Sequence, residues 1–419
     1  MLKFLKKLTG PKDPRDAFFA EVEAVLRTLP GYQSSRRVDS LFALDVVTTS
    51  GETSRFFLDN LFAETRDLDG EKRSGRIAFV ARVVLTSHSP KSEARETFEA
   101  VRASLVPVIR GATFGLLSAQ DVPGDEPDKA AKAAESSPIR RPFVPFLDLL
   151  VVRDTESSMS YVAASNPASW GVCADQIFEA ALESLPRLAD PPIERRPDGL
   201  LAVASHDSYE SSRLLLPGFL ASFRGKVDGH PIAIIPDRET LLIGGDERQE
   251  TVERLAAVAD EVFAQSRRSV SPALYTCRPD TGAVVPYLPL IGPTRLTVEL
   301  GHEKLKLSEY ERQKRILDQL RTESSPFIAS FKLYQRDERL ISLGFWTEGL
   351  DIYLPETSHV ALVVDPGGKS ERVVEAPFEA IASRLTKVEG LHPTRYRTGA
   401  FPAEAELEAI GSRYGIVRS

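Results

Sequence analysis

The chain has 419 residues, 42% of them hydrophobic and 27% charged, which is ordinary for a globular protein and excludes global disorder. A chain of this length exceeds what one hydrophobic core usually organises, so we expect two folded domains. The formal net charge of -7 at pH 7 gives no positive field that could hold a phosphate backbone, so we expect no nucleic-acid partner.

The chain opens with predicted helices and strands. Hydrophobic residues recur at helical spacing from Pro14 to Leu29, and the following Pro30-Gly31 pair ends this helix. Residues 105–110 are apolar and rich in β-branched side chains, which predicts a strand, and Pro107 favours an edge position or a strand start. The other elements predicted in this part are strands at 42–47 and 55–58 and helices at 59–68, 72–86 and 93–104.

The middle of the chain continues the alternation after one irregular segment. Residues 120–138 are acidic and then rich in alanine, lysine and serine, without an apolar period, so we expect a flexible, solvated loop. The elements predicted after it are strands at 146–153, 160–164, 200–204, 231–235, 240–243, 272–277 and 283–290 and helices at 171–185, 208–223 and 246–265.

The sequence changes in character after Gly292-Pro293, where a charge-rich helix is predicted at 304–322. It is followed by predicted strands at 327–335, 340–347, 359–365, 371–375 and 391–398 and by helices at 377–386 and 402–413. We therefore expect an α+β protein of two mixed α/β-layer domains with largely antiparallel sheets. Their expected bounds are 15–292 and 293–419, after a basic N-terminal segment at 1–14.

Three motifs in the first expected domain resemble a known family. They are Leu105–Arg110, Trp170-Gly-Val172 with the helix after it, and Asp207-Ser-Tyr-Glu-Ser-Ser-Arg-Leu-Leu215, which residues 231–243 follow at the family's spacing. These features resemble the YtpQ-like family of uncharacterised bacterial proteins over about residues 15–290. The resemblance implies a cytoplasmic α+β fold and no established activity, cofactor or catalytic residue.

His206 and Asp207 stand beside several serines, and this combination suggests a hydrolase. The residues are adjacent where a strand meets the predicted helix 208–223, whereas a nucleophile, a base and an orienting group must meet through side-chain geometry. Asp207 or Ser208 suits the N-cap of that helix better. The catalytic residues therefore stay unassigned, with His206 and Asp207 as the candidates.

Two arginines are the candidates for ligand binding. Arg110 ends the predicted strand 105–110, and Arg213 belongs to the 207–215 motif. A guanidinium can bind a carboxylate or a phosphate through two parallel hydrogen bonds. The alternative is a structural ion pair with an acidic helix end.

We expect no cofactor and no metal site. Gly244-Gly245 precedes two acidic residues that repel an anion, and residues 365–370 contain Gly-Lys-Ser without the first glycine of a phosphate-binding loop. Cys173 and Cys277 lack zinc-site spacing, and the six histidines are scattered singly. We interpret the cysteines as small buried hydrophobic residues in a reducing cytoplasm.

The sequence also bears on location. No apolar run reaches the ~20 residues that cross a bilayer, and the N-terminus lacks a secretory signal peptide. We therefore expect a soluble cytoplasmic protein. Residues 1–8 are basic and amphipathic, so contact with a membrane surface is the alternative to a docked or frayed terminal helix.

These observations favour a non-enzymatic binding or adaptor protein that presents its surfaces to another protein. The alternative is a hydrolase or transferase acting on a small anionic substrate, which Arg110 and Arg213 bind while Asp207 or His206 acts as the base. A cleft that unites Arg110, His206 and Arg213 within a few ångströms would favour the enzyme. Separate ion pairs and helix caps would favour the binding protein, and the oligomeric state has no sequence signal.

Overall fold

The computed structural model describes residues 14–38, 42–66, 68–86, 97–116, 129–155, 159–322, 324–414 and 417–418. The chain divides into two compact units: unit 1 is Met1–Thr97 with Leu117–Ala133, and unit 2 is Phe98–Leu116 with Ala134–Ser419. Both units combine helices with sheets in which antiparallel pairing dominates, which confirms the predicted α+β class. The separate domain that the sequence suggests from residue 293 onwards stays a prediction.

Unit 1 is a small sheet with helices packed on it. Its elements are α1 (Pro14–Leu26), β1 (Tyr32–Val38), β2 (Ala43–Thr48), β3 (Thr53–Phe57), α2 (Asp59–Glu64) and α3 (Gly70–Thr86). The three strands pair antiparallel in sequence order, and Phe18, Val22, Leu44 and Ile77 are among the residues that fill the core between sheet and helices. Strand β1 was not predicted, because its mostly polar residues face solvent and show no apolar alternation.

The first sheet of unit 2 contains the family-like segment 105–110. Its order is β4 (Leu105–Gly111), β6 (Leu147–Asp154) and β5 (Arg140–Val144), with β7 (Met159–Tyr161) also paired to β6. All seven residues of β4 are buried, yet among the described strands it pairs only with β6, so Pro107 lies on an edge strand as predicted. The helices near this sheet are α4 (Phe98–Arg102), α6 (Asn166–Trp170) and α7 (Ala174–Glu183), of which α7 packs on β4.

The second sheet of unit 2 has six strands in the order β13-β12-β10-β11-β9-β8. Their bounds are β8 (Ile193–Arg195), β9 (Leu201–Val203), β10 (Pro231–Ile234), β11 (Leu242–Gly245), β12 (Leu274–Cys277) and β13 (Val284–Pro286). Helix α8 (Gln249–Gln265) covers one face through Val252, Leu255 and Ala259. Cys277 is buried in the core of this region, as predicted, whereas Cys173 is exposed, and neither forms a disulfide.

Several predicted elements differ from the structure in their bounds, and two segments differ more deeply. The helix expected at 208–223 is replaced by two short 3-10 helices, η5 (Ser211–Leu215) and η6 (Leu220–Phe223), because Pro217 and Gly218 interrupt it and Gly218 has a φ of 72°. The expected loop 120–138 contains helix α5 (Lys129–Ser136), since its alanines and lysines are strong helix formers. Residues 120–128 of that predicted loop lie outside the described residues.

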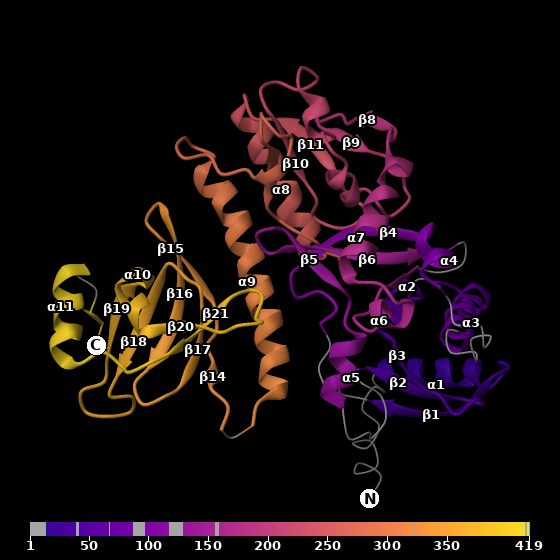
Figure 1. The fold of residues 1–419 in the computed structure, drawn as a ribbon, viewed down its shortest axis with the longest axis horizontal. Helices are drawn as coiled ribbons and strands as arrows, with labels where there is room; N and C mark the ends of the chain where they lie inside the picture. The colour runs from indigo at the N-terminus through magenta and orange to yellow at the C-terminus, as the bar shows by residue number, and fades with distance from the viewer. Residues whose placement is uncertain are drawn as a thin grey trace, which may run out of the picture. The chain divides into compact units, whose positions relative to one another are not determined.

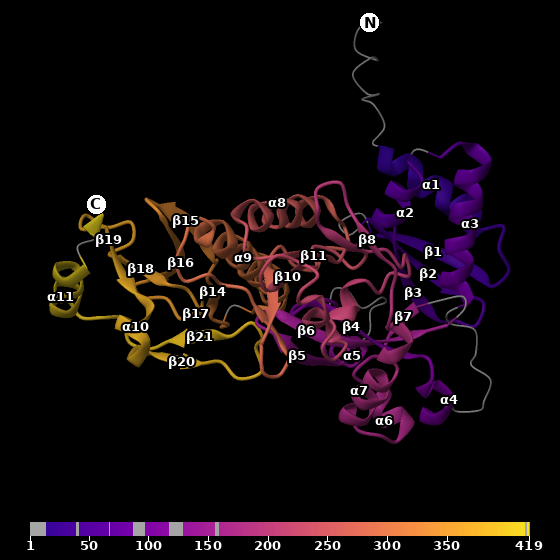
Figure 2. The same ribbon diagram turned by 90° about the horizontal axis from the view of Figure 1, so that it is seen from above.

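Helix α9 (Arg295–Leu320) connects these sheets to the C-terminal part of unit 2, and Figure 1 shows it running between them. The C-terminal part has a four-stranded sheet, β14-β17-β21-β20, and a five-stranded sheet, β15-β16-β18-β19-β22, which Figure 2 shows as neighbours. Their strands are β14 (Phe327–Ile328), β15 (Lys332–Arg336), β16 (Arg339–Thr347), β17 (Ile352–Pro355), β18 (His359–Val364), β19 (Arg372–Pro377), β20 (Leu385–Lys387), β21 (Arg395–Thr398) and β22 (Val417–Arg418).

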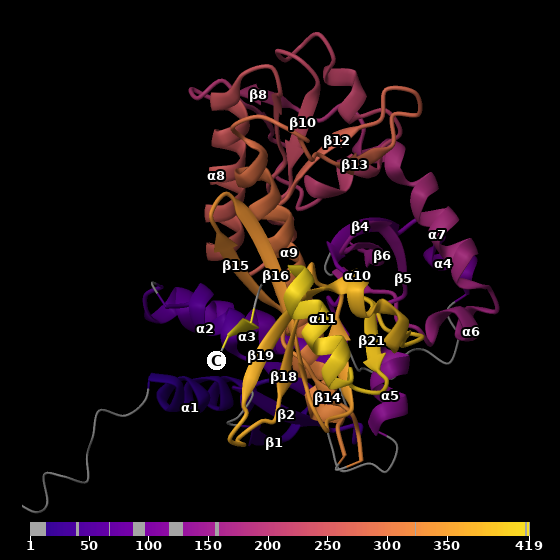
Figure 3. The same ribbon diagram turned by 90° about the vertical axis from the view of Figure 1, so that its left-hand side faces the viewer.

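The core of the C-terminal part lies between its sheets and two helices, α10 (Phe378–Ile381) and α11 (Glu404–Tyr414). Figure 3 shows α11 against the five-stranded sheet, where it packs on β19. Trp346 is almost fully buried in this core, and its ring contacts Phe401 edge to face with ring centroids 5.4 Å apart. Across the described segments, no helix combines the length and the apolar character that crossing a bilayer requires.

Candidate functional site

One face of the sheet β4-β6-β5 changes from apolar to charged along its length. Val106, Val108 and Leu150 cover the apolar end. At the other end, Arg110 lies opposite Asp148 in the antiparallel register, and the two residues are 2% and 0% exposed. Directly opposed residues point to the same face of a sheet. The sheet therefore places a guanidinium and a carboxylate in the interior of unit 2.

Arg110 is only partly satisfied there. Its Nε donates a hydrogen bond to the Tyr161 hydroxyl at 2.9 Å, and its Nη1 donates to the Ile109 carbonyl at 2.7 Å. Its Nη2 is buried and has no acceptor among the described residues. The guanidinium carbon lies 5.8 Å from the centre of the Phe114 ring and 5.9 Å from that of Tyr161. Arg110 therefore holds a buried charge against aromatic rings with no hydrogen bond to a carboxylate in the described chain.

A second arginine is close to the first. Burial and then the positive charge of Arg110 lower the pKa of Arg238 to about 10. The Arg238 Nε is also buried without an acceptor in the part of the chain that the structure describes. Its backbone carbonyl accepts a hydrogen bond from the Ser211 N–H at 3.4 Å, which brings η5 against it. The charges of the buried Arg110 and the half-buried Arg238 thus act on each other, an arrangement that is unfavourable unless an anion compensates it.

The 207–213 segment borders these arginines and has an unusual backbone. His206 and Ser208 adopt left-handed φ values of 52° and 64°. Asp207 Oδ1 accepts a hydrogen bond from the Tyr209 N–H at 2.9 Å, and both Asp207 oxygens accept from Arg213, at 3.0 and 2.7 Å. Burial alone would raise the pKa of Asp207, but the hydrogen bonds from Arg213 and Tyr209 hold it below its ordinary value. Asp207 therefore closes a turn and an ion pair, and η5 begins without a side-chain cap.

Several polar side chains of this segment are buried without partners. Glu210, Ser211 and Ser212 are at most 1% exposed. The atoms without a hydrogen-bond partner among the described residues are Glu210 Oε2, Ser211 Oγ, Ser212 Oγ and Arg213 Nε. Buried polar groups are nearly always hydrogen-bonded in folded proteins, so such a concentration points to an absent binding partner or to water.

The four residues singled out in the sequence do not form one group. Arg213 and Asp207 bond to each other, whereas Arg110 bonds to Tyr161. His206 is exposed and makes no hydrogen bond or ion pair with either arginine in the described chain. Sequence reasoning missed Arg238 and Tyr161 as neighbours of Arg110. Arg238 could have been found, since it belongs to the family-like segment 231–243.

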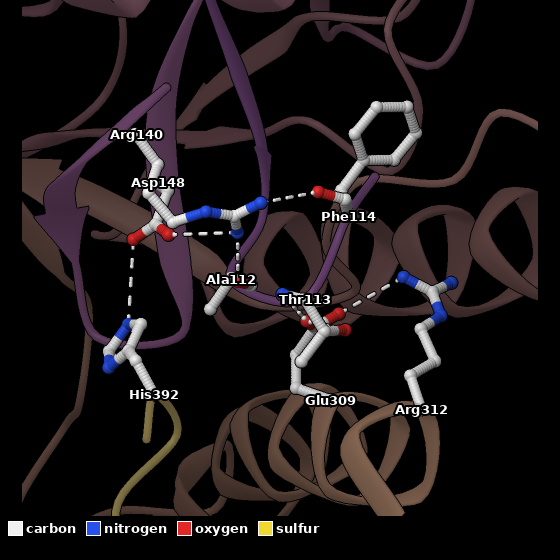
Figure 4. Close-up of polar contacts among 8 residues, drawn as sticks. All are labelled: Ala112, Thr113, Phe114, Arg140, Asp148, Glu309, Arg312 and His392. Atoms are coloured by element: carbon white, nitrogen blue, oxygen red, sulfur yellow. Dashed lines mark hydrogen bonds and ion pairs between the residues drawn. The ribbon is translucent and has the colours of Figure 1, made fainter. Parts of the chain in front are cut away.

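A second polar cluster adjoins the first through Asp148 (Figure 4). Asp148 Oδ2 forms an ion pair with Arg140 Nη1 at 3.5 Å, and Asp148 Oδ1 lies 3.4 Å from His392 Nε2; both distances are longer than good hydrogen bonds. Arg140 also donates to the carbonyls of Ala112 and Phe114. Burial lowers the pKa of Arg140, and the Asp148 charge opposes this effect. Arg140 thus ties β5 and β6 to the turn that follows Arg110.

Helix α9 holds the same turn from the other side. Glu309 Oε2 accepts hydrogen bonds from the Thr113 N–H and hydroxyl, both at 2.7 Å, and Glu309 Oε1 accepts from Arg312 at 3.1 Å. Glu309 is fully buried, and burial raises its pKa. Gly111 leaves room for this carboxylate, because a Cβ there would lie 2.3 Å from Glu309 Oε1. Figure 4 shows Glu309 reaching the turn 112–114 from α9.

The remaining motifs are structural. A Cβ on Gly245 would lie 1.8 Å from the Asp228 carbonyl oxygen, so this glycine allows close packing of the chain. Asp365 Oδ2 accepts a hydrogen bond from the Ser370 N–H, which closes the predicted turn at 365–370. Among the residues with described positions, no group of three His, Cys, Asp or Glu side chains is arranged to hold a metal ion.

Comparison with known proteins finds two UPF0354 proteins of Listeria. The protein from Listeria welshimeri is 22% identical over 221 residues, which are 52% of this chain and 76% of the relative. The protein from Listeria monocytogenes serotype 4a is 32% identical over 91 residues, which are 21% of this chain and 34% of the relative. No family model and no solved structure matches the chain. The chain is therefore similar to uncharacterised bacterial proteins, whose names state no activity, ligand or partner.

Proposed function

We propose that this protein is a non-enzymatic binding protein that binds a small anionic group at Arg110 and Arg238. The observation that carries the proposal is the Arg110 Nη2, which is buried without an acceptor among the described residues, on a guanidinium whose charge acts on that of Arg238. Leaving a buried charge unpaired costs several kcal/mol, and a bound carboxylate or phosphate would supply the missing acceptors.

The surroundings of the arginine pair support an oxyanion as the ligand. The Tyr161 hydroxyl is already bonded to Arg110, and η5 brings the Ser211 and Ser212 hydroxyls to the same region, without partners among the described residues. Hydroxyl groups can donate to an oxyanion while the arginines balance its charge. An apolar ligand would leave the Arg110 Nη2 and the two serine hydroxyls unsatisfied.

The alternative, a hydrolase or transferase acting on a small anionic substrate, has less support. Both oxygens of Asp207 are engaged by Arg213, and the lowered pKa of Asp207 makes it a poor proton acceptor. The other proposed base, His206, is exposed and contacts neither arginine in the described chain. Arg213 and Asp207 form an ion pair apart from Arg110 and His206, which supports the binding protein over the enzyme.

Ligand-linked stability tests the proposal. Orthophosphate, sulfate, acetate and citrate would be added singly while urea unfolding of the full chain is followed by tryptophan fluorescence. A ligand at 100 times its Kd should stabilise the wild type by about 2.7 kcal/mol. Arg110→Met and Arg238→Met should abolish that gain, and Arg248→Met, an exposed arginine paired with Asp228, should keep it. Equal stabilisation of all four proteins, or of none, would refute the anion site.

We also propose that the protein is cytoplasmic, as the resemblance to the YtpQ-like family implies, and that it presents its surfaces to another protein. Affinity capture of the tagged chain from its native cytoplasm, with Arg110→Ala and Arg213→Ala variants in parallel, tests this part by mass spectrometry. A stoichiometric protein partner supports the adaptor role. Recovery of a small molecule alone, lost in both variants, argues for a ligand-sensing pocket or an enzyme.

A further inference from the structure

The segment between β13 and α9 exposes three large aliphatic side chains. Leu288, Leu290 and Ile291 are 54%, 90% and 87% exposed. Burying one such side chain is worth about 1.5–3 kcal/mol, so three of them within four residues form a costly surface unless a partner covers them. Contiguous apolar patches of this kind mark interaction sites on soluble proteins.

Two of these side chains, Leu288 and Leu290, line a groove of about 520 Å³. Its apolar wall includes Leu288, Leu290, Phe146 and Leu305. Phe146 has a φ of 66°, a conformation that costs free energy for a bulky residue, and its ring packs edge to face on Tyr310. The groove is therefore lined both by a fixed aromatic ring and by exposed aliphatic side chains. Its volume lies within the usual range for binding sites.

The groove also contains one unsatisfied acceptor. Glu303 lines the groove and is 9% exposed. Its Oε1 accepts a hydrogen bond from Lys306, but its Oε2 is buried and has no donor in the described part of the chain. The neighbouring Glu299 is paired with Arg295 at 2.8 Å. Burial lowers the pKa of His302 to about 4, so this groove residue is neutral at pH 7 and does not balance Glu303. The groove thus lacks one hydrogen-bond donor.

We propose that this groove binds a peptide segment of another protein in which an aliphatic side chain stands next to a lysine or arginine. The aliphatic side chain would pack among Leu288, Leu290 and Phe146, and the cation would donate to Glu303 Oε2. The net charge of -7 favours a cationic partner over an acidic one. The groove uses β13, α9 and the β5–β6 turn, so the proposal does not depend on the Arg110–Arg238 anion site.

The probe is a fluorescein-labelled hexapeptide of alternating leucine and lysine, titrated with the full chain and read by fluorescence anisotropy. Two comparison peptides carry glutamate in place of lysine or serine in place of leucine. Protein variants are Leu290→Ser and Glu303→Gln, with Leu350→Ser and Glu311→Gln as exposed controls away from the groove. Tryptophan fluorescence verifies that each variant is folded.

The leucine–lysine peptide should bind the wild type and both controls, and each groove variant should weaken it about tenfold. The comparison peptides should bind at least as weakly. Three results would overturn the proposal: no binding of the leucine–lysine peptide, equal binding to Glu303→Gln, or a concentration-dependent dimer in sedimentation that Leu290→Ser abolishes. The last result would show that a second copy of the chain covers the groove.

Discussion

Adding one methyl group at Gly111 should destabilise unit 2 through Glu309 alone. The Cβ of Gly111→Ala would lie 2.3 Å from Glu309 Oε1 and 2.8 Å from its Cδ, closer than van der Waals contact allows. Relieving this clash requires Glu309 to retract from the two Thr113 hydrogen bonds. Overpacking of this kind costs about 1–3 kcal/mol, and a weakened hydrogen bond to a charged group adds to it. We expect Gly111→Ala to lower the free energy of unfolding by about 3 kcal/mol.

A double-mutant cycle separates this clash from other effects of the substitution. In a Glu309→Ala background the added methyl group has space, and Gly111→Ala should be neutral or stabilise by up to about 1 kcal/mol, because alanine restricts the unfolded chain. Urea unfolding followed by tryptophan fluorescence is the assay, since both tryptophans, Trp170 and Trp346, belong to unit 2. An equal cost of Gly111→Ala in both backgrounds would refute the reasoning.

Three further predictions concern single residues. Arg395 is fully buried and donates hydrogen bonds to Gln313 and to three backbone carbonyls. Arg395→Met should therefore lower the free energy of unfolding in urea by about 3 kcal/mol or more. Arg397 is exposed, so the control Arg397→Met should leave this free energy unchanged. The pKa of His302 is lowered to about 4 in the folded chain, so as pH falls the unfolded chain binds a proton at His302 before the folded chain does. Unit 2 should therefore lose stability as pH falls from 6.5 towards 4. The variant His302→Gln should show a smaller loss over this range. In unit 1, burial alone would raise the pKa of Asp45, but hydrogen bonds from Arg55 and Arg36 hold it below its ordinary value. The stability that these interactions contribute is therefore fully present above the ordinary pKa of an aspartate, and it is lost as pH falls through the lowered pKa. Asp45→Asn should remove that pH dependence and cost about 3 kcal/mol, because Arg55 of β3 would lose its buried partner in β2, and hydrogen exchange in both strands should become faster.

Helices and strands in which apolar residues recur at regular spacing could be predicted from the sequence. Elements that depend on a helix-breaking residue or on tertiary contacts could not. The helix at 14–29, the β-branched strand 105–110 and the hairpin 272–290 show the period of the structure they adopt. The 208–223 segment has a helical apolar pattern, but Pro217-Gly218 breaks it, and polar residues that would face solvent on a helix are buried instead.

The candidate site could be predicted only in part, because it too depends on tertiary contacts. Arg110 and Arg213 stand out because each belongs to a recognisable motif. The contacts that give the site its character join distant parts of the chain: Thr113 and Glu309 are 196 residues apart, and Arg110 and Tyr161 are 51 apart. A single sequence contains no signal for such pairings, and spacing alone suggested an N-cap for Asp207 where the structure has an ion pair.

Strand β4 lies between two chain segments of unit 1, because the chain enters unit 2 at Phe98 and returns to unit 1 at Leu117. No uninterrupted stretch of the gene therefore encodes unit 2 without also encoding part of unit 1. An expression fragment that starts at Ala134 would omit the strand with Arg110 and expose β6 along the edge that β4 covers. During synthesis, β4 leaves the ribosome before its partner β6. Until β6 follows, the seven residues of β4, which are buried in the finished sheet, stay exposed. Segments of unit 1 thus flank β4 on both sides in the sequence.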